Sequence, residues 1–186
     1  MNAARPSILR YTIFPSDLGW IALAGSGDHV ARLSFGHASA EAARRALLAE
    51  LRGAARDDLW FGELVERLQA YAGGARDDFR DVLIAYGDDS RFRIAVSEWC
   101  RRIPPGITVT YGKLAAAAGS PNAARAVGAV MRTNRVPLIV PCHRVVAGSG
   151  KLHGYSAADG LATKRRLLDM ELASWVTEAV RQVVEV

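Results

Sequence analysis

The stretch Val140-Pro141-Cys142-His143-Arg144-Val145-Val146 is the one around which the rest of the chain is organised. It belongs to a longer apolar, β-branched run, 138–146, interrupted at its centre by a proline, a thiol, an imidazole and a guanidinium. A proline removes a backbone donor, so a strand is expected to stop or turn there. The pattern predicts a thiol presented at a bend between hydrophobic side chains, where it is both firmly held and reachable.

A buried free cysteine most often acts as a small hydrophobe. Burying the polar neighbours His143 and Arg144 near a core costs free energy, however, and their presence there favours a chemical role for Cys142. A thiol becomes a nucleophile as the thiolate, commonly beside an imidazole. An extended strand would point His143 away from Cys142, so contact requires a bend or a bridging water. A carboxylate would orient the imidazole, and an unrelated Cys-His hydrolase stays open at this point.

Bulk composition narrows the class of protein. The 186 residues suffice for one large domain or two small ones, and half of them are hydrophobic. No segment reads as a secretory signal or membrane span, and Cys100 and Cys142 are too few for a disulfide scaffold. A cytoplasmic protein without membrane contact is therefore expected. The net charge of +5 is compatible with a polyanionic partner but is a weak signal alone.

The N-terminal part is predicted to be an α/β scaffold. Apolar runs bounded by Pro and Gly predict strands, two of them joined as a hairpin, and periodic apolar positions predict two helices. The expected strands are 10–14, 20–24, 30–35 and 81–86, and the expected helices run from Glu41 to about Arg52 and from Asp57 or Asp58 to Gly73, with Leu59, Leu64, Leu68 and Tyr71 inward. Gly87-Asp88-Asp89-Ser90 marks the predicted domain boundary.

Beyond this boundary the pattern becomes helical. Ser90 is expected to cap a helix that buries four apolar side chains, and helices Tyr111–Ala118 and Pro121 to about Arg132 follow with a glycine-containing turn between them. This order is typical of a helix-turn-helix, although similar helical hairpins also occur in cores that bind no DNA. The four expected inward residues are Phe92, Val96, Trp99 and Ile103.

The second of these helices has two distinct faces. Arg125, Gly128, Ala129 and Arg132 share a smooth side with two cations, which would let the backbone approach a nucleic acid closely. The side chains expected on the other side are Val127, Val130, Met131 and Asn134. A basic amphipathic helix from Leu161 to about Leu172 and a helical tail are expected to end the chain, the charges of the former forming a solvated face.

An ordered set of motifs resembles the O(6)-alkylguanine-DNA alkyltransferases, also called methylated-DNA–protein-cysteine methyltransferases. Pro141-Cys142-His143-Arg144-Val145 resembles their active-site signature. The resemblance is strong over roughly 90–172 and reaches the N-terminal part in outline. It is also carried by 109–115, 122–128, Met131, Asn134, 136–138, Gly154-Tyr155-Ser156 and 164–171.

The resemblance implies a two-domain repair protein. It would have an N-terminal ribonuclease-H-like α/β domain, 1–88, a winged-helix-like domain with the helix-turn-helix, 89–174, and an extension, 175–186. It would transfer an alkyl group from guanine O6, and less readily from thymine O4, to Cys142, irreversibly and once per molecule. Double-stranded DNA would be its partner, it would act as a monomer, and no cofactor or metal is implied.

The resemblance also assigns roles by position. His143 would deprotonate Cys142 through water, Glu171 would orient His143, Asn134 would brace the turn before the active site, and Tyr111 would contact the phosphate and the guanine. Arg125 would replace the flipped base in the stack. The remaining DNA-contacting residues would be Ala124, Gly128, Ala129 and Arg132, and the pocket would comprise Met131, Pro137, Val145, Tyr155 and Ser156.

The sequence departs from the family pattern at several points. Arg135 stands where the family usually has Pro, Ser97 where it often has Trp, and the loop 157–160 is longer than the common form. These departures leave pocket width and alkyl-size preference open. The zinc ligands of some members are absent. A non-catalytic lesion-binding relative would replace the nucleophile, and position 142 is Cys.

Overall fold

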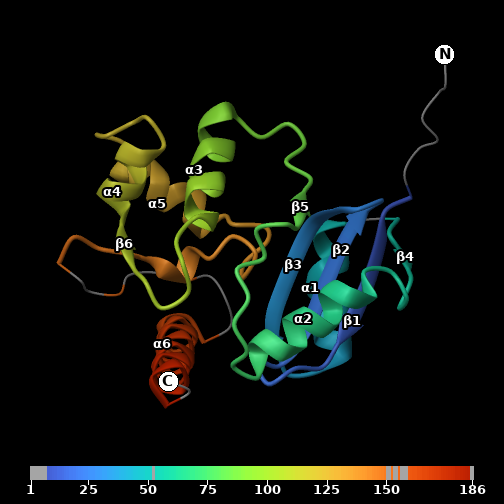
Figure 1. Ribbon diagram of the computed structural model, residues 1–186. Helices are drawn as coiled ribbons and strands as arrows, with labels where there is room; N and C mark the ends of the chain where they lie inside the picture. Colours follow the sequence, from blue (N-terminus) through green and yellow to red (C-terminus); the bar gives the residue numbers. More distant parts are fainter. Residues whose placement is uncertain (1–7, 52, 150–151, 153–154, 156–158, 185–186) are drawn as a thin grey trace. The chain divides into compact units, whose positions relative to one another are not determined.

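The chain folds into two compact units in the computed structural model, which describes residues 8–51, 53–149, 152, 155 and 159–184 (Figure 1). Unit 1 comprises Met1–Gly73 and Asp81–Gly87, and unit 2 comprises Gly74–Arg80 and Asp88–Val186. The chain thus crosses from one unit to the other more than once near the boundary expected at Gly87–Ser90. In the described part of the chain no helix combines the length and apolarity needed to span a membrane.

A five-stranded sheet with the order β4-β1-β2-β3-β5 forms the centre of unit 1. β1, β2 and β3 pair antiparallel, whereas the two-residue strands β4 and β5 add parallel edges. The sequence predicted four of these strands but not β4, whose two residues are both exposed and show no alternation. The strands are β1 (Arg10–Phe14), β2 (Trp20–Ser26), β3 (His29–His37), β4 (Ala55–Arg56) and β5 (Leu83–Ile84).

Two helices flank this sheet. α1 (Ala40–Glu50) lies behind the sheet and α2 (Gly62–Ala72) crosses in front of it (Figure 1). Ser39 caps α1, because its side chain accepts a hydrogen bond from the Ala42 amide. α2 begins later than Asp57 or Asp58, since Asp57 Oδ1 accepts from the Leu59 amide in a turn. The expectation that Leu59 points inward was wrong, because it is 92% exposed.

Unit 2 is mainly helical, with a small parallel sheet of β6 and β7. Ser90 caps α3 and Thr110 caps α4, each accepting a hydrogen bond from a first-turn amide. α4 and α5 pack against each other and against α3, as a helix-turn-helix requires. The elements are α3 (Arg91–Arg101), β6 (Val109–Thr110), α4 (Tyr111–Ala117), α5 (Ala124–Arg132), the 3₁₀ turn η1 (Cys142–Arg144), β7 (Val145–Val146) and α6 (Leu161–Val184).

Three details of unit 2 differ from the sequence predictions. Trp99, expected in the core, is exposed beneath the Arg102 guanidinium, and Cys100 takes the buried position. Pro121 lies in a turn before α5 rather than in its first turn, since the helix begins at Ala124. α6 continues without a break from Leu161 to Val184, so the tail is part of this helix.

Candidate active site

Cys142 begins a single 3₁₀ turn directly after Pro141. The turn is closed by hydrogen bonds from the Cys142 amide to Val140 O at 2.8 Å and from the Arg144 amide to Pro141 O at 2.9 Å. This is the bend expected from the proline within an apolar run. Cys142, His143 and Arg144 are all at least 95% buried, so the three polar groups lie within the core of unit 2.

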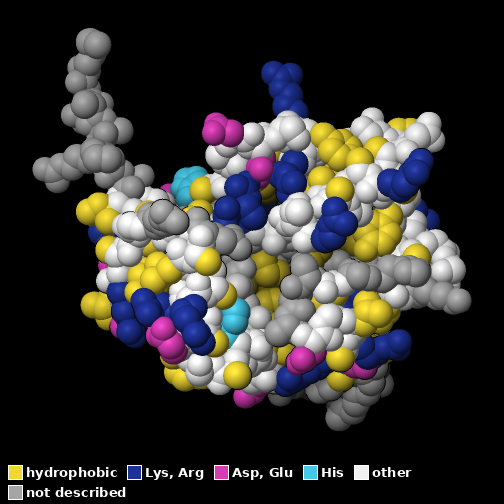
Figure 2. All heavy atoms as spheres, turned by 180° about the vertical axis from the view of Figure 1, so that it is seen from behind, with side chains coloured by type: hydrophobic (Ala, Val, Ile, Leu, Met, Phe, Trp, Pro, Cys, Tyr) yellow, Lys and Arg dark blue, Asp and Glu magenta, His cyan; other side chains and the backbone are white. Residues whose placement is uncertain are grey.

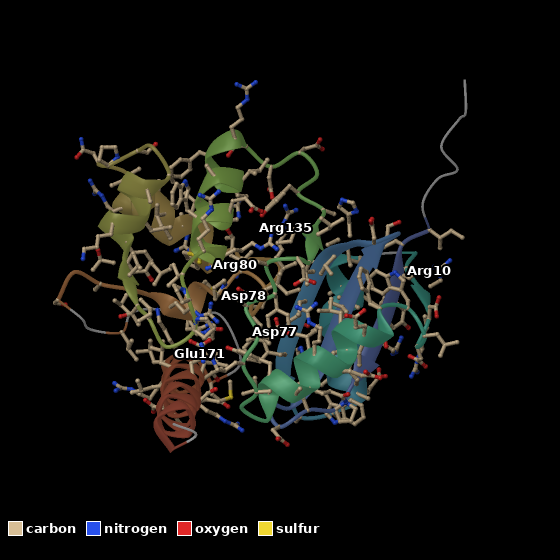
Figure 3. All side chains as sticks on the ribbon, in the orientation of Figure 1. Arg10, Asp77, Asp78, Arg80, Arg135 and Glu171 are labelled. Atoms are coloured by element: carbon tan, nitrogen blue, oxygen red, sulfur yellow. The ribbon has the colours of Figure 1, made fainter. Side chains whose placement is uncertain are left out.

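The carboxylate of Glu171 on α6 (Figure 3) lies against this turn and balances its positive charge. Its Oε1 lies 2.8 Å from His143 Nε2 and accepts from Arg144 Nη2 at 2.7 Å. Arg144 Nε adds contacts of 3.1 Å to both carboxylate oxygens, and the Gly106 amide donates to Oε2 at 3.1 Å. Arg144 Nη1 also donates to Ile103 O at 2.6 Å. The buried carboxylate is therefore matched by a guanidinium and an imidazole.

The environment sets the protonation of this cluster. Burial alone would raise the pKa of Glu171, but the hydrogen bonds and charges of His143 and Arg144 outweigh it and hold that pKa well below its ordinary value. Burial lowers the pKa of His143, with Glu171 opposing the effect. A neutral imidazole carries its proton on the nitrogen that faces a carboxylate, so His143 Nε2–H donates a hydrogen bond to Glu171. Nδ1 is then the basic nitrogen of His143.

Asn134 links the end of α5 to the thiol. Its Nδ2 lies 3.2 Å from Cys142 Sγ and 2.7 Å from Val140 O, and its Oδ1 accepts from the Val136 amide at 3.1 Å. Burial raises the pKa of Cys142, whereas the Asn134 hydrogen bond, the Lys164 charge and a hydrogen bond from Tyr155 lower it. Donors to the sulfur favour the thiolate, which is the form that attacks.

Lys164 is a site residue that the sequence analysis missed. It was expected on a solvated face, but it is fully buried and its Nζ donates to Val145 O at 2.6 Å. Burial lowers the pKa of Lys164, and the neighbouring thiols oppose this shift. A signal was present, because Lys164, Leu167 and Glu171 share the 3.6-residue stripe of one helix face.

The exposed face of α5 is smooth. Arg125, Ala129 and Arg132 are exposed, and a Cβ added at Gly128 would meet nothing within 4 Å. The opposite face buries Val127, Val130 and Met131. Packing within the protein therefore does not require a glycine at 128, and the helix backbone there is accessible to a binding partner.

The other predicted site residues are distributed around the thiol. Tyr111 is the first residue of α4, partly buried, and burial raises the pKa of its hydroxyl. Ala124, the first residue of α5, and Pro137 are partly exposed, whereas Val145 is buried. Tyr155 is partly buried. Ser156 and the loop residues 157–158 lie outside the described residues.

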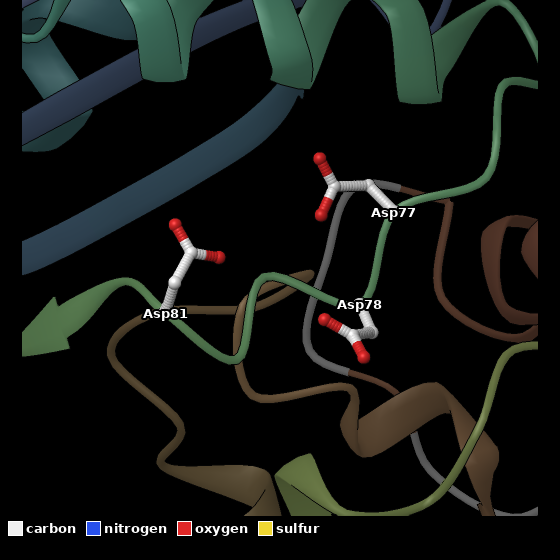
Figure 4. A group of neighbouring side chains, drawn as sticks. All are labelled: Asp77, Asp78 and Asp81. Atoms are coloured by element: carbon white, nitrogen blue, oxygen red, sulfur yellow. The ribbon is translucent and has the colours of Figure 1, made fainter.

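A cluster of three carboxylates lies away from the thiol, and two of its members are in ion pairs. Asp77, Asp78 and Asp81 lie in one short segment (Figure 4), where Asp81 accepts from Arg67 at 2.6 and 2.8 Å and Asp78 pairs with Arg80 at 3.4 Å. The carboxylate oxygens of the three lie within 4.8 Å of one another, as those of exposed acidic groups often do without an ion, and we assign no metal to them. On the face seen in Figure 2, Lys and Arg side chains form several small groups with Asp and Glu among them.

Comparison with known proteins places both parts of the chain. Residues 91–173 match the 6-O-methylguanine DNA methyltransferase DNA binding domain, and residues 9–86 match the ribonuclease-like domain of that enzyme. The methylated-DNA–protein-cysteine methyltransferase of Methanosarcina acetivorans is 36% identical over 170 residues, which are 87% of this chain and 97% of that protein. The one of Mycobacterium leprae is 38% identical over 156 residues, 84% and 88% of the two chains.

Solved structures agree with these matches. The O6-methylguanine methyltransferase of Mycobacterium tuberculosis superposes with a TM-score of 0.72 at 33% identity, covering 90% of this chain and 94% of that one. A structure of Mycobacterium tuberculosis OGT in complex with DNA gives a TM-score of 0.73 at 33% identity, covering 89% and 94%.

Proposed function

This chain belongs to the 6-O-methylguanine DNA methyltransferase family, and on that basis we propose that Cys142 accepts the alkyl group from O6 of an alkylated guanine. The protein repairs DNA by direct reversal, transferring an alkyl group from DNA to a cysteine of its own. The family assignment covers both units and removes the alternative of an unrelated Cys-His hydrolase.

The 3.2 Å contact from Asn134 Nδ2 to Cys142 Sγ is the observation that carries the assignment of the acceptor. Cys142 has a hydrogen-bond donor and a nearby cation, both of which stabilise a thiolate. Cys100 is completely buried, and burial raises its pKa well above the ordinary value. Of the two thiols, Cys142 is the better nucleophile.

The geometry supports a simple sequence of proton transfers. The Cys142 thiol gives its proton through a water molecule to His143 Nδ1, and Glu171 and its bond to Nε2 stabilise the resulting imidazolium. The thiolate attacks the sp3 alkyl carbon, an S–C bond forms, and the C–O6 bond breaks with its electron pair passing to the guanine. Tyr111 donates a hydrogen bond to the departing guanine, and the proton held by the His143 imidazolium returns through water to neutralise the guanine anion.

The product explains why each molecule reacts once. An S-alkyl thioether has no activated carbonyl for water to attack, so hydrolysis cannot regenerate the thiol. Repair is therefore stoichiometric, with one protein molecule used for each lesion. The lesion range we propose is O6-alkylguanine, with O4-alkylthymine a slower substrate.

We assign DNA contact to the smooth face of α5. Open space over Gly128 lets the helix backbone approach a minor groove, and Arg125 and Arg132 supply positive charge toward phosphates. The target base must leave the stack to reach a buried thiol, at a cost of a few kcal/mol. Arg125 fills the vacated space, and Ala124 and Ala129 line the approach. The related Mycobacterium tuberculosis OGT has been solved with DNA.

Paired cysteine variants test the acceptor. Cys142→Ala should abolish transfer from a duplex with O6-methylguanine while duplex binding persists, whereas Cys100→Ala should retain transfer. Methyl transfer by Cys142→Ala would contradict the assignment. The same experiment on a duplex containing O4-methylthymine measures the lesion range. We also propose that the protein is a cytoplasmic monomer, and sedimentation before and after repair tests the monomeric state.

A further inference from the structure

The turn that carries Asn134 is tied down by charged side chains outside the thiol site. Asp89, just before α3, pairs with Arg93 (Nε to Oδ1, 3.5 Å) and, through Oδ2, with Nη2 of Arg135. Arg93 donates to Thr133 Oγ1 at 2.9 Å and to Thr133 O at 3.4 Å. The residues on both sides of Asn134 are thus connected, directly or through Arg93, to a single carboxylate.

This cluster is shielded enough to matter energetically. The side chain of Asp89 is 16% exposed, and those of Arg93 and Arg135 are 28% and 33% exposed. Isolated surface pairs contribute little, but a carboxylate held between two guanidinium groups in a partly buried setting is restrained on both sides. The network also spans the sequence, because Arg135 lies 46 residues after Asp89.

Outside this cluster the turn is held by backbone bonds at the end of α5 and by the two side-chain bonds of Asn134. The Asn134 amide reaches Met131 O at 3.3 Å, and Thr133 Oγ1 lies 3.0 Å from Ala129 O at the end of α5. Position 135 is Arg and so lacks the fixed φ that a proline would impose. The direction of the Asn134 side chain therefore depends on its own bonds to Val140 O and the Val136 amide, together with the side-chain contacts that place the residues on either side of it.

We propose that Asp89 is a positioning residue for alkyl transfer, which holds Arg135 and Arg93 so that Asn134 Nδ2 stays within hydrogen-bonding distance of the Cys142 sulfur. The inference rests on the proposed role of Asn134 at the thiol. It assigns a task in the reaction to an ion pair that acts through the two residues flanking Asn134.

A variant pair isolates this effect. Asp89→Ala should slow single-turnover methyl transfer about 10-fold, a coupling typical of residues in one hydrogen-bond network. It should also shift the pH profile of iodoacetamide alkylation at Cys142 to higher pH, because a donor to the thiolate is misplaced. Asp88→Ala, the matched control, removes the neighbouring exposed carboxylate and should leave both measurements within about twofold of the unmodified protein.

The Asn134→Ala background separates positioning from general destabilisation. There, Asp89→Ala should cause no further slowing and no further shift of the pH profile, whatever it does to thermal unfolding. Equal slowing in both backgrounds, or an unchanged rate for Asp89→Ala alone, would overturn the inference. Normal rates for Asn134→Ala alone would overturn the role of Asn134 first, and the inference with it.

Arg135→Ala provides the same test should Asp89→Ala fail to fold. It removes one of the two pairs and leaves Asp89 with Arg93, so the slowing should be smaller but of the same kind. Rates equal to those of the unmodified protein in both backgrounds would overturn the inference here as well.

Discussion

Glu171→Gln should destabilise the protein strongly, because it removes a charge from a buried and fully partnered cluster. The side chain of Glu171 is 2% exposed, and its partners His143 and Arg144 are no more exposed than that. Glutamine keeps the shape of the side chain but replaces one acceptor oxygen by an NH₂ group that faces donors. Arg144 then becomes a buried cation without its counter-charge.

The size of the effect follows from the burial of the cation that remains. Removing one partner of a buried ion pair costs about 3–5 kcal/mol, since the remaining charge stays desolvated. In a protein of this size about 1 kcal/mol corresponds to about 2–4 °C, so the midpoint of thermal unfolding should fall by about 6–20 °C. Alkyl transfer should also slow, because the imidazolium formed at His143 no longer has the carboxylate that stabilises it.

The pH dependence provides a second signature with a definite sign. The pKa of Glu171 is lower in the folded protein than in the unfolded chain, so its contribution is fully present above the unfolded value, about 4.3. That contribution is lost as pH falls from there toward the folded value. The unmodified protein should therefore lose stability on acidification more steeply than Glu171→Gln.

Thermal unfolding followed by circular dichroism between pH 3.5 and 7.5 measures both effects. Asp169→Asn is the matched control, because Asp169 is an exposed carboxylate on the same helix, and its unfolding midpoint should stay within about 2 °C. An unfolding midpoint of Glu171→Gln within about 2 °C of the unmodified protein, with the same dependence on pH, would refute the view that Glu171 stabilises the folded site.

Three further variants test other parts of the site. Lys164→Met should raise the pKa of Cys142 and slow transfer about 10-fold, because it removes a nearby cation and its bond to Val145 O. Arg165→Met, the control, should change neither the pKa nor the rate. The pH dependence of iodoacetamide alkylation at Cys142 measures the pKa in both variants. Gly128→Leu should leave the unfolding midpoint within about 2 °C, because a Cβ at this position meets nothing within 4 Å, yet weaken duplex binding more than about 10-fold in fluorescence titrations. Arg125→Ala should slow repair of duplex DNA much more than reaction with free O6-benzylguanine. Equal losses of rate on both substrates would contradict the proposal that Arg125 replaces the flipped base in the stack.

Local patterns predicted the parts of the site that depend on nearby residues. The proline inside an apolar run predicted the bend at Cys142, and the periodicity of 124–132 separated the exposed face of α5 from the buried one. The pairing of His143 with Glu171 came from the resemblance, because no periodicity specifies which of several acids on distant helices meets an imidazole.

The features missed are those decided by tertiary packing. Lys164 was assigned to solvent from its basic neighbours, but the same stripe of α6 that buries Leu167 also buries Lys164 and satisfies it with a carbonyl. Trp99 was assigned to the core by helical spacing, yet it is exposed and makes a cation–π contact with Arg102. The Asp89–Arg135 pair joins residues too far apart in sequence for any local pattern to connect.

Intact-protein mass spectrometry after incubation with excess duplex containing O6-methylguanine tests the central claim most directly. The account predicts one added methyl group per protein molecule, reached at saturation and mapped by peptide analysis to Cys142. An added methyl at Cys100, continued turnover beyond one lesion per molecule, or no mass change with lesion binding retained would contradict it.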